Sequence, residues 1–76
     1  MNEFEQAIHF HQQGDLTQAK ALYQKIIAEN PKHADAHHLL GLAYAQEDDF
    51  RQAITSIQQA VAIKPKEALY HNNLAN

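Results

Sequence analysis

The sequence predicts an all-α fold, a solenoid of helical hairpins with two full repeats and one further helix. Three observations in the 76 residues lead to this prediction. The chain resembles itself at a shift of 34 residues: eleven of the 42 aligned pairs are identical, where about three are expected by chance. Within each copy, apolar residues recur at spacings of three and four, the period of an α-helix. Gly14, Pro31 and Pro65 fall where this period breaks, and no strand pattern competes.

The repeat predicts five helices joined by loops of two to four residues. The clearest is residues 50–63, in which Phe50, Ala53 and Ile57 lie on one face. The same rhythm runs through residues 16–29. Such short loops make consecutive helices antiparallel neighbours. In chain order, the predicted helices are about 2–13, 16–29, 34–46, 50–63 and 67–76.

Aspartates mark the starts of two of these helices. Asp15 precedes Gln18 by three residues, and Asp49 precedes Gln52 by the same interval. The aspartate can accept from the free amides of the first turn, and the glutamine can reach back to the aspartate amide, as in a capping box.

Glycine and proline mark the turns. Pro31 and Pro65 end the second and fourth helices, because the residue before a proline is pushed out of helical geometry. Gly14 lies between the first two helices, and Asp48 takes its place in the second copy. If this turn needs a positive φ, glycine adopts it freely and aspartate does so at a higher energy.

Composition and charge exclude several classes of protein. Six Lys and Arg residues stand against nine Asp and Glu, a net charge of −3, whereas nucleic-acid and anionic-membrane surfaces need a basic patch. The absence of cysteine excludes disulfides and thiol chemistry, and no apolar run approaches the ~18 residues of a membrane span. No nucleophile is paired with a base. We therefore expect a soluble, cytoplasmic protein with no enzymatic activity and no cofactor.

The two copies share a set of small, aromatic and turn residues at fixed spacing. These are Leu40, Gly41, Tyr44, Ala53, Ala60 and Pro65 in the second copy, residues 34–67, and Ala7, Phe10, Gly14, Asp15, Ala19, Tyr23 and Pro31 in the first. A third copy begins at Ala68 and stops at Asn76. On these residues the chain resembles, along its whole length, the tetratricopeptide repeat (TPR) family: the second copy has almost the whole signature of the family, and the first copy has a large part of it.

The resemblance implies how the hairpins pack. Small residues would let the two helices of a hairpin approach closely, and aromatic rings would fill the space beside them. The small residues are Ala7, Ala19, Gly41 and Ala53, and the rings belong to Phe10, Tyr23, Tyr44 and Phe50. Glu3 and Gln6 stand where the family usually has large apolar residues, which suits a first helix that no repeat precedes.

We expect one TPR domain over residues 1–76, with repeat 1 at about 1–33, repeat 2 at 34–67 and part of a third repeat at 68–76. Because the last helix lacks a hairpin partner, the chain is expected to be the N-terminal fragment of a longer protein. That helix would then cover residues 50–63, or it would pair two chains with each other.

The resemblance also implies a function, the binding of a peptide or partner protein in the groove lined by the first helix of each hairpin. Several groove positions are more apolar than a solvated face needs, which favours an apolar segment held beside amides and imidazoles. An alternative is that these residues only pack between helices. The expected groove residues are Phe4, Ile8, His11, His38, Leu39, Leu42, Gln46, Leu69, Asn72 and Asn73.

Two further functions within the family can be compared with these residues. TPR domains that grip a C-terminal carboxylate use Lys and Arg on this face, and here no cation is available there. Asn73 resembles the groove asparagines of TPR arrays attached to O-linked glycosyltransferases. The alternative function is therefore a substrate-presenting N-terminal arm of a larger enzyme, similar to the bacterial arrays that precede glycosyltransferase or sulfotransferase domains.

Six histidines raise the alternative of a metal site. His33 and His37 are four residues apart, but His33 is expected in the turn before its helix, and His9 and His11 point to different faces. We therefore expect no metal, and instead a stability that depends on pH near 6.5, where imidazole titrates. The carboxylates at 47–49 are expected to cap the helix that follows them.

Overall fold

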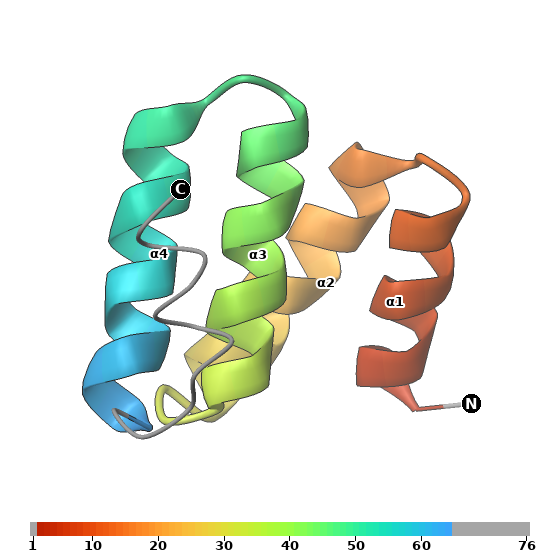
Figure 1. Ribbon diagram of the computed structural model, residues 1–76. Helices are drawn as coiled ribbons and strands as arrows, with labels where there is room; N and C mark the ends of the chain where they lie inside the picture. The colour runs from red at the N-terminus through yellow and green to blue at the C-terminus, as the bar shows by residue number, and fades with distance from the viewer. Residues whose placement is uncertain (1, 65–76) are drawn as a thin grey trace.

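The computed structural model describes residues 2–64, which form four antiparallel α-helices (Figure 1). In chain order these are α1 at Glu3–Gln12, α2 at Leu16–Glu29, α3 at Ala34–Gln46 and α4 at Phe50–Ile63. No strand occurs among the described residues, so the predicted all-α class and the first four predicted helices are confirmed. α1 is one residue shorter at each end than predicted. The fifth predicted helix, 67–76, lies outside the described residues.

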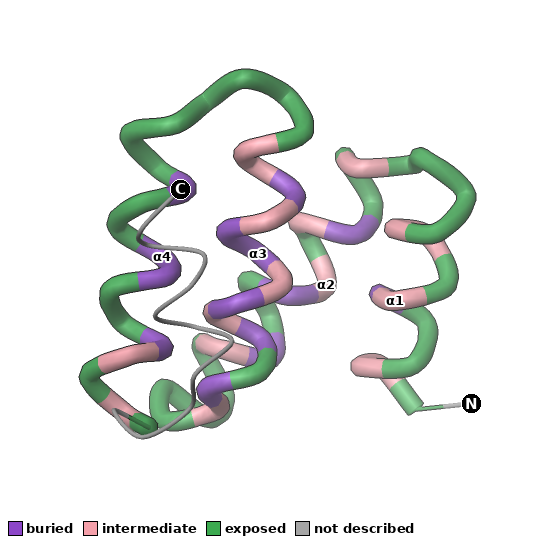
Figure 2. The backbone as a smooth tube through the Cα atoms, viewed as in Figure 1, coloured by how far each residue is buried: buried purple, intermediate pink, exposed green. Residues whose placement is uncertain are grey.

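The helices form two hairpins, α1–α2 and α3–α4, and α3 packs against both α2 and α4. Figure 2 shows the consequence for burial: buried residues gather along α3, whereas Ala7 is the buried residue of α1. A helix with neighbours on two sides loses water from two faces, while the first helix of a row loses it from one.

Small residues allow the helices of each hairpin to cross closely. Ala7 and Ala19 are 0% exposed and Ala53 is 4% exposed. A Cβ at Gly41 would lie 2.6 Å from Cγ1 of Ile57 and 3.0 Å from the Ala53 carbonyl oxygen, which is closer than side chains pack. The predicted close approach is therefore confirmed at Gly41 and Ala53, and Ala7 and Ala19 are buried in the first hairpin as the prediction requires.

The four predicted rings do not all lie in the core. Tyr23 is 0% exposed, and Phe10 and Tyr44 are partly buried beside it. The prediction for Phe50 is wrong, because its side chain is 58% exposed and that of Ile54, one turn later, is 49% exposed. The apolar stripe of α4 is wider than the face that α3 covers, which leaves one edge of the stripe in contact with water.

A side chain caps the start of each of these helices. The pairs of accepting side chain and donating amide are Asn2 with Glu5, Asp15 with Gln18, His33 with Ala36, and Asp49 with Gln52. The two predicted aspartate caps are confirmed. The cap at His33 was not predicted, because an imidazole is not among the side chains that usually cap a helix.

The second half of the predicted capping box does not form. The backbone N–H of Asp15 donates to the carbonyl oxygen of Phe10 at 2.9 Å. The N–H of Asp49 donates to the Tyr44 carbonyl oxygen at the same distance. The amide that each glutamine was expected to reach is therefore already bonded to the end of the preceding helix.

Both hairpin turns need a positive φ, as the sequence indicated. φ is 82° at Gly14 and 63° at Asp48. A Cβ at Gly14 would meet no atom within 4 Å, so backbone strain rather than crowding favours glycine there. Aspartate tolerates the same region at Asp48 because its short polar side chain costs less there than most others.

Candidate functional site

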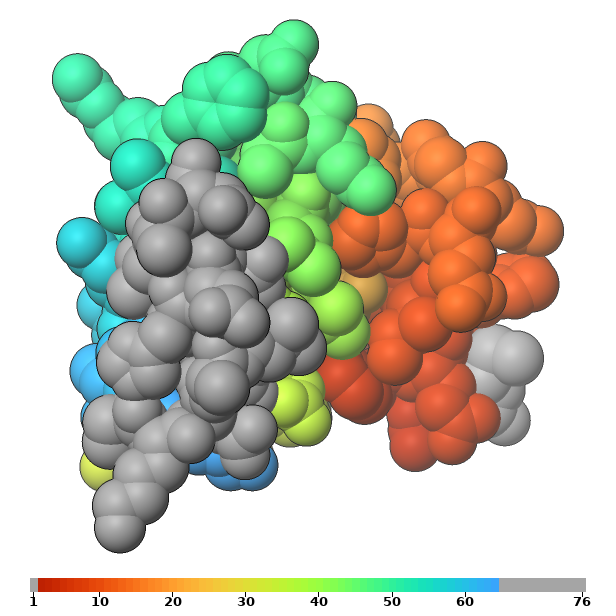
Figure 3. Space-filling model, viewed as in Figure 1, coloured from red at the N-terminus to blue at the C-terminus, as the bar shows by residue number. Residues whose placement is uncertain are grey.

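A hollow of about 280 Å³ opens where α1, α2 and α3 meet. In the space-filling view, the red and orange first hairpin meets the green α3 along this part of the surface (Figure 3). The hollow is lined by Ile8, His11 and Gln12 from α1, Tyr23 from α2, and Leu39 and Leu42 from α3. Its volume is just below the ~300–1,000 Å³ range of small-molecule pockets, which suits one or two side chains of a peptide.

Helical spacing explains why these residues come together. Ile8 and His11 are three residues apart on α1, and Leu39 and Leu42 are three apart on α3, so each pair shares one face of its helix. Because α1 and α3 both pack beside α2, the two pairs face a common space above the Tyr23 ring.

The buried end of the hollow contains a hydroxyl that is held in place. Tyr23 is fully buried, and its hydroxyl lies 3.0 Å from Nδ1 of His11. The two rings meet edge to face, with their centroids 5.9 Å apart. Burial raises the pKa of Tyr23 to about 12, so the phenol keeps its proton at neutral pH and can donate.

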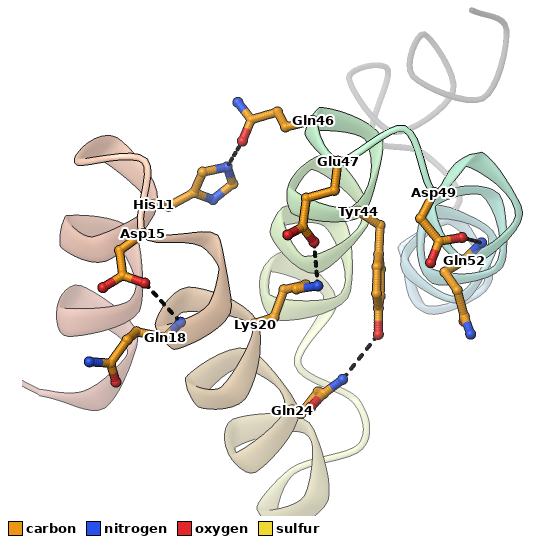
Figure 4. A network of polar contacts seen from close by, with 10 residues as sticks. All are labelled: His11, Asp15, Gln18, Lys20, Gln24, Tyr44, Gln46, Glu47, Asp49 and Gln52. Carbon is orange, nitrogen blue, oxygen red and sulfur yellow. Dashed lines mark hydrogen bonds and ion pairs between the residues drawn. The ribbon is translucent and has the colours of Figure 1, made fainter.

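His11 connects three helices. Its Nε2 lies 2.8 Å from Oε1 of Gln46, an oxygen that can only accept, so Nε2 donates (Figure 4). In the neutral ring Nδ1 is then the acceptor, and it receives the hydroxyl hydrogen of Tyr23. The imidazole thus joins α1 to the end of α3 and to the middle of α2.

Two ion pairs lie between the helices, and none of their residues lines the hollow. Lys20 on α2 forms an ion pair with Glu47, which follows α3, and its Nζ lies 5.0 Å from the centre of the Tyr44 ring. Lys25 on α2 pairs with Glu3 on α1, and the hydrogen bond to this carboxylate raises the pKa of Lys25. Among residues 2–64, no Asp, Glu, Lys or Arg lines the hollow.

The structure brings together four of the predicted groove residues, Ile8, His11, Leu39 and Leu42, in the lining of the hollow. Gln46 adjoins them through its hydrogen bond to His11. Whether this surface binds a partner stays a prediction.

Two other predicted groove residues take different places. Phe4 is half-buried between helices, with its ring edge-to-face to Tyr23 at 6.4 Å between centroids and 4.7 Å from the His33 ring. His38 is only 5% exposed, so it offers a partner almost no surface, and burial lowers its pKa. The remaining three predicted groove residues, Leu69, Asn72 and Asn73, lie outside the described residues.

Two lining residues were not predicted. Gln12 is four residues after Ile8 on the same face of α1, so helical spacing alone could have identified it. Tyr23 comes from the second helix of its hairpin, whereas the predicted groove used residues of first helices only. Only the crossing of α1 and α2 places this ring at the base of the hollow.

The histidines near the start of α3 have structural partners. Nδ1 of His33 accepts from the Ala36 amide at 3.1 Å, and Nε2 of His37 donates to the Pro31 carbonyl oxygen at 2.9 Å. Among residues 2–64, no group of three or more His, Cys, Asp and Glu side chains could hold a metal ion. Within the same range, no helix is long and apolar enough to cross a membrane.

Comparison with known proteins places this arrangement in context. A family model for the tetratricopeptide repeat matches residues 10–76. A relative, the TPR repeat-containing protein PA4299 of Pseudomonas aeruginosa, is 33% identical over 70 residues. The match covers 92% of the present chain and 28% of the relative, so the chain spans little more than a quarter of that protein's length.

Proposed function

The chain belongs to the tetratricopeptide repeat family, and from this premise we propose that it binds a peptide or partner protein in the groove formed by α1 and α3. Repeats of this family generally serve as protein-interaction modules. The observation that carries the proposal is the hollow, in which three aliphatic side chains stand around a buried tyrosine between two hairpins.

The chemistry of the lining indicates what kind of segment it would accept. Ile8, Leu39 and Leu42 are half-buried, so a partner's apolar side chain could remove their remaining surface from water. Gln12 and Gln46 are exposed beside them, and their amides can bond to the main chain of an extended or helical segment. Since no Lys or Arg of residues 2–64 lines the hollow, a C-terminal carboxylate would find no cation from this part of the chain.

The test is a selection of peptides from a randomised library displayed on phage, followed by affinity measurements with purified protein. Selected peptides should share a large apolar residue. Leu42→Asp should weaken their binding by about 10- to 100-fold, the equivalent of losing one buried aliphatic side chain.

A matched control distinguishes binding in the groove from nonspecific hydrophobic binding. Ile54 is an apolar residue on α4 that is 49% exposed and lies outside the hollow. Ile54→Asp should leave the affinity unchanged, and circular dichroism should show that both variants are folded. Failure to enrich any peptide, or equal binding by the wild type and Leu42→Asp, would rule out the groove as the binding surface.

A further inference from the structure

His11 is a lining residue of the hollow whose charge can change between pH 5 and 8. It lies in the last turn of α1 and is half-buried, so water still reaches part of its ring. Both ring nitrogens are bonded within the protein. Nε2 donates to Gln46 on α3, as Figure 4 shows, and Nδ1 accepts from the hydroxyl of Tyr23 on α2. These two bonds hold the ring in the wall of the hollow.

Protonation changes one of the two bonds. Because Nε2 already carries a hydrogen, a second proton goes to Nδ1, which then becomes a donor. It faces the Tyr23 hydroxyl, which also donates, so the hydroxyl hydrogen has to turn away before the oxygen can accept. Tyr23 is 0% exposed and belongs to a buried cluster with Ala7 and Leu40, so a hydrogen that turns away meets neither water nor an accepting side chain of this cluster. A buried donor without a partner costs free energy.

We propose that protonation turns the His11 ring out of the wall and into water, so that the hollow loses its affinity for an apolar side chain. The charged ring gains hydration, and the place that it leaves lets water reach the Tyr23 hydroxyl. The link to Gln46 is lost at the same time. The change in the wall needs no ligand, whereas the release of a bound side chain rests on the proposed function.

The groups near His11 on α1 and α2 allow this change. The last turn of a helix favours a positive charge, so the position of His11 is compatible with protonation. His9, two residues earlier, is exposed on a different side of α1, and Asp15, beyond the turn, caps α2. Burial raises the pKa of Tyr23 to about 12, so the phenol stays uncharged from pH 5 to 8.

The groups on the side of α3 add no opposing change of charge. The group that meets His11 there is the amide of Gln46, which does not titrate. The next residue, Glu47, forms an ion pair with Lys20, so its carboxylate already has a cation. α4 packs against α3 and contributes none of the lining residues found within 2–64. The change of charge in the described wall of the hollow therefore comes from His11.

The first arm of the test follows the ring by NMR of the full chain from pH 5 to 8, without a ligand. At pH 8 the ring should carry its hydrogen on Nε2 and none on Nδ1, as its two bonds require. The ring centroids of His11 and Tyr23 are 5.9 Å apart and meet edge to face, which brings ring hydrogens within range of a nuclear Overhauser effect. This effect should disappear as His11 is protonated, while circular dichroism shows that the chain stays folded.

The second arm measures the affinity of an apolar peptide from the selection above, made without histidine and with blocked ends. An imidazole that titrates near 6.5 is about one-tenth charged at pH 7.5 and about nine-tenths charged at pH 5.5. Binding that requires the neutral ring should therefore weaken by about 10-fold between these two pH values.

Three variants identify the residue responsible. His11→Gln and His11→Asn carry amides that do not titrate, and the asparagine oxygen can lie where Nδ1 accepts from Tyr23. Both variants should bind with an affinity that is the same at pH 7.5 and 5.5. His9→Gln is the matched control, because His9 is exposed on the same helix and is not a lining residue, and it should keep the 10-fold change.

The two arms fail separately. If the selection enriches no peptide, the proposed function is wrong, and the NMR arm still decides whether the wall responds to protonation. Three results would overturn the inference: a hydrogen on Nδ1 at pH 8, a contact between the His11 and Tyr23 rings that persists after protonation, or a pH dependence of binding that both His11 variants retain.

Discussion

The two hairpins have the same backbone plan and differ at the point where their helices cross. In the first, Ala7 meets a helix that contains the fully buried Tyr23. In the second, the equivalent positions are Gly41 and Ile57, and the helices come so close that Gly41 has no room for a Cβ. The tyrosine hydroxyl needs a hydrogen-bond partner, which His11 provides, whereas isoleucine needs none. The first hairpin therefore contributes a polar group to the hollow, and the second contributes tight packing.

The largest effect should come from filling the tighter crossing. Gly41→Val should destabilise the fold by about 3 kcal/mol, because the new Cβ would press on Ile57 and on the Ala53 backbone oxygen, which cannot rotate away. The measurement is urea unfolding followed by circular dichroism. The control is Ala7→Gly at the equivalent position, which should cost about 1 to 2 kcal/mol through helix propensity and the loss of one buried methyl group. If the two variants lose the same stability, the hairpins do not differ in the way described.

A smaller effect should come from removing the hydroxyl that distinguishes the first hairpin. Tyr23→Phe should cost about 1 kcal/mol, because His11 Nδ1 loses its donor in a half-buried site. Tyr44→Phe is the matched control, since the Tyr44 hydroxyl accepts from Gln24 in an exposed contact, and it should change the stability by less than about 0.5 kcal/mol. Equal losses in the two variants would mean that the hydrogen bond between Tyr23 and His11 contributes no more stability than the exposed one between Tyr44 and Gln24.

The two turns give a third comparison. Gly14→Ala should cost about 1 kcal/mol because alanine is strained at φ of 82°. Asp48→Gly should stabilise by about 0.5 kcal/mol, the relief of strain at φ of 63° less the added entropy of the unfolded chain. Thermal melts of both variants would check this. A loss of stability in Asp48→Gly would show that the aspartate side chain itself stabilises the turn.

The smallest predicted effect concerns pH and His38 of the second hairpin, whose counterpart in the first is Phe4. Burial holds the pKa of His38 below its usual value near 6.5, and Asp35 opposes this in part. Below pH 6.5 the unfolded chain therefore binds more protons than the folded one. The contribution of His38 to stability is full above that pH and decreases as the pH falls toward the lowered pKa.

Urea midpoints at pH 7.5 and 5.5 should show this loss in the wild type and a smaller one in His38→Gln. The difference between the two proteins isolates His38 from the other five histidines. A pH dependence that the substitution leaves unchanged would contradict this role of the buried imidazole.

Local signals made the helices predictable. Asp15 and Asp49 cap helices in the structure as the sequence indicated, because a cap involves residues three positions apart. The positive φ at Gly14 and Asp48 could be expected for the same reason. Such features depend on neighbours in the chain, which the sequence displays directly.

Features that depend on how helices cross were harder to predict. Phe50 follows the apolar period of α4, but which part of a stripe is covered depends on the width of the neighbouring helix. Tyr23 lines the hollow although it comes from a second helix, and His38 is buried although the resemblance placed it in the groove. These positions could not be derived from spacing, because spacing gives the face of a helix and not what lies against that face.

The bonds of His11 have a consequence for how the protein unfolds. In a linear array each unit interacts with the next one only, so a terminal helix can fray while the rest stays folded. His11 joins α1 directly to Gln46 at the end of α3, past the intervening helix. Release of α1 therefore also breaks a contact of the second hairpin, which makes the two hairpins more cooperative. Amide hydrogen exchange near the end of α1 should accordingly be slower than expected for the first helix of an array.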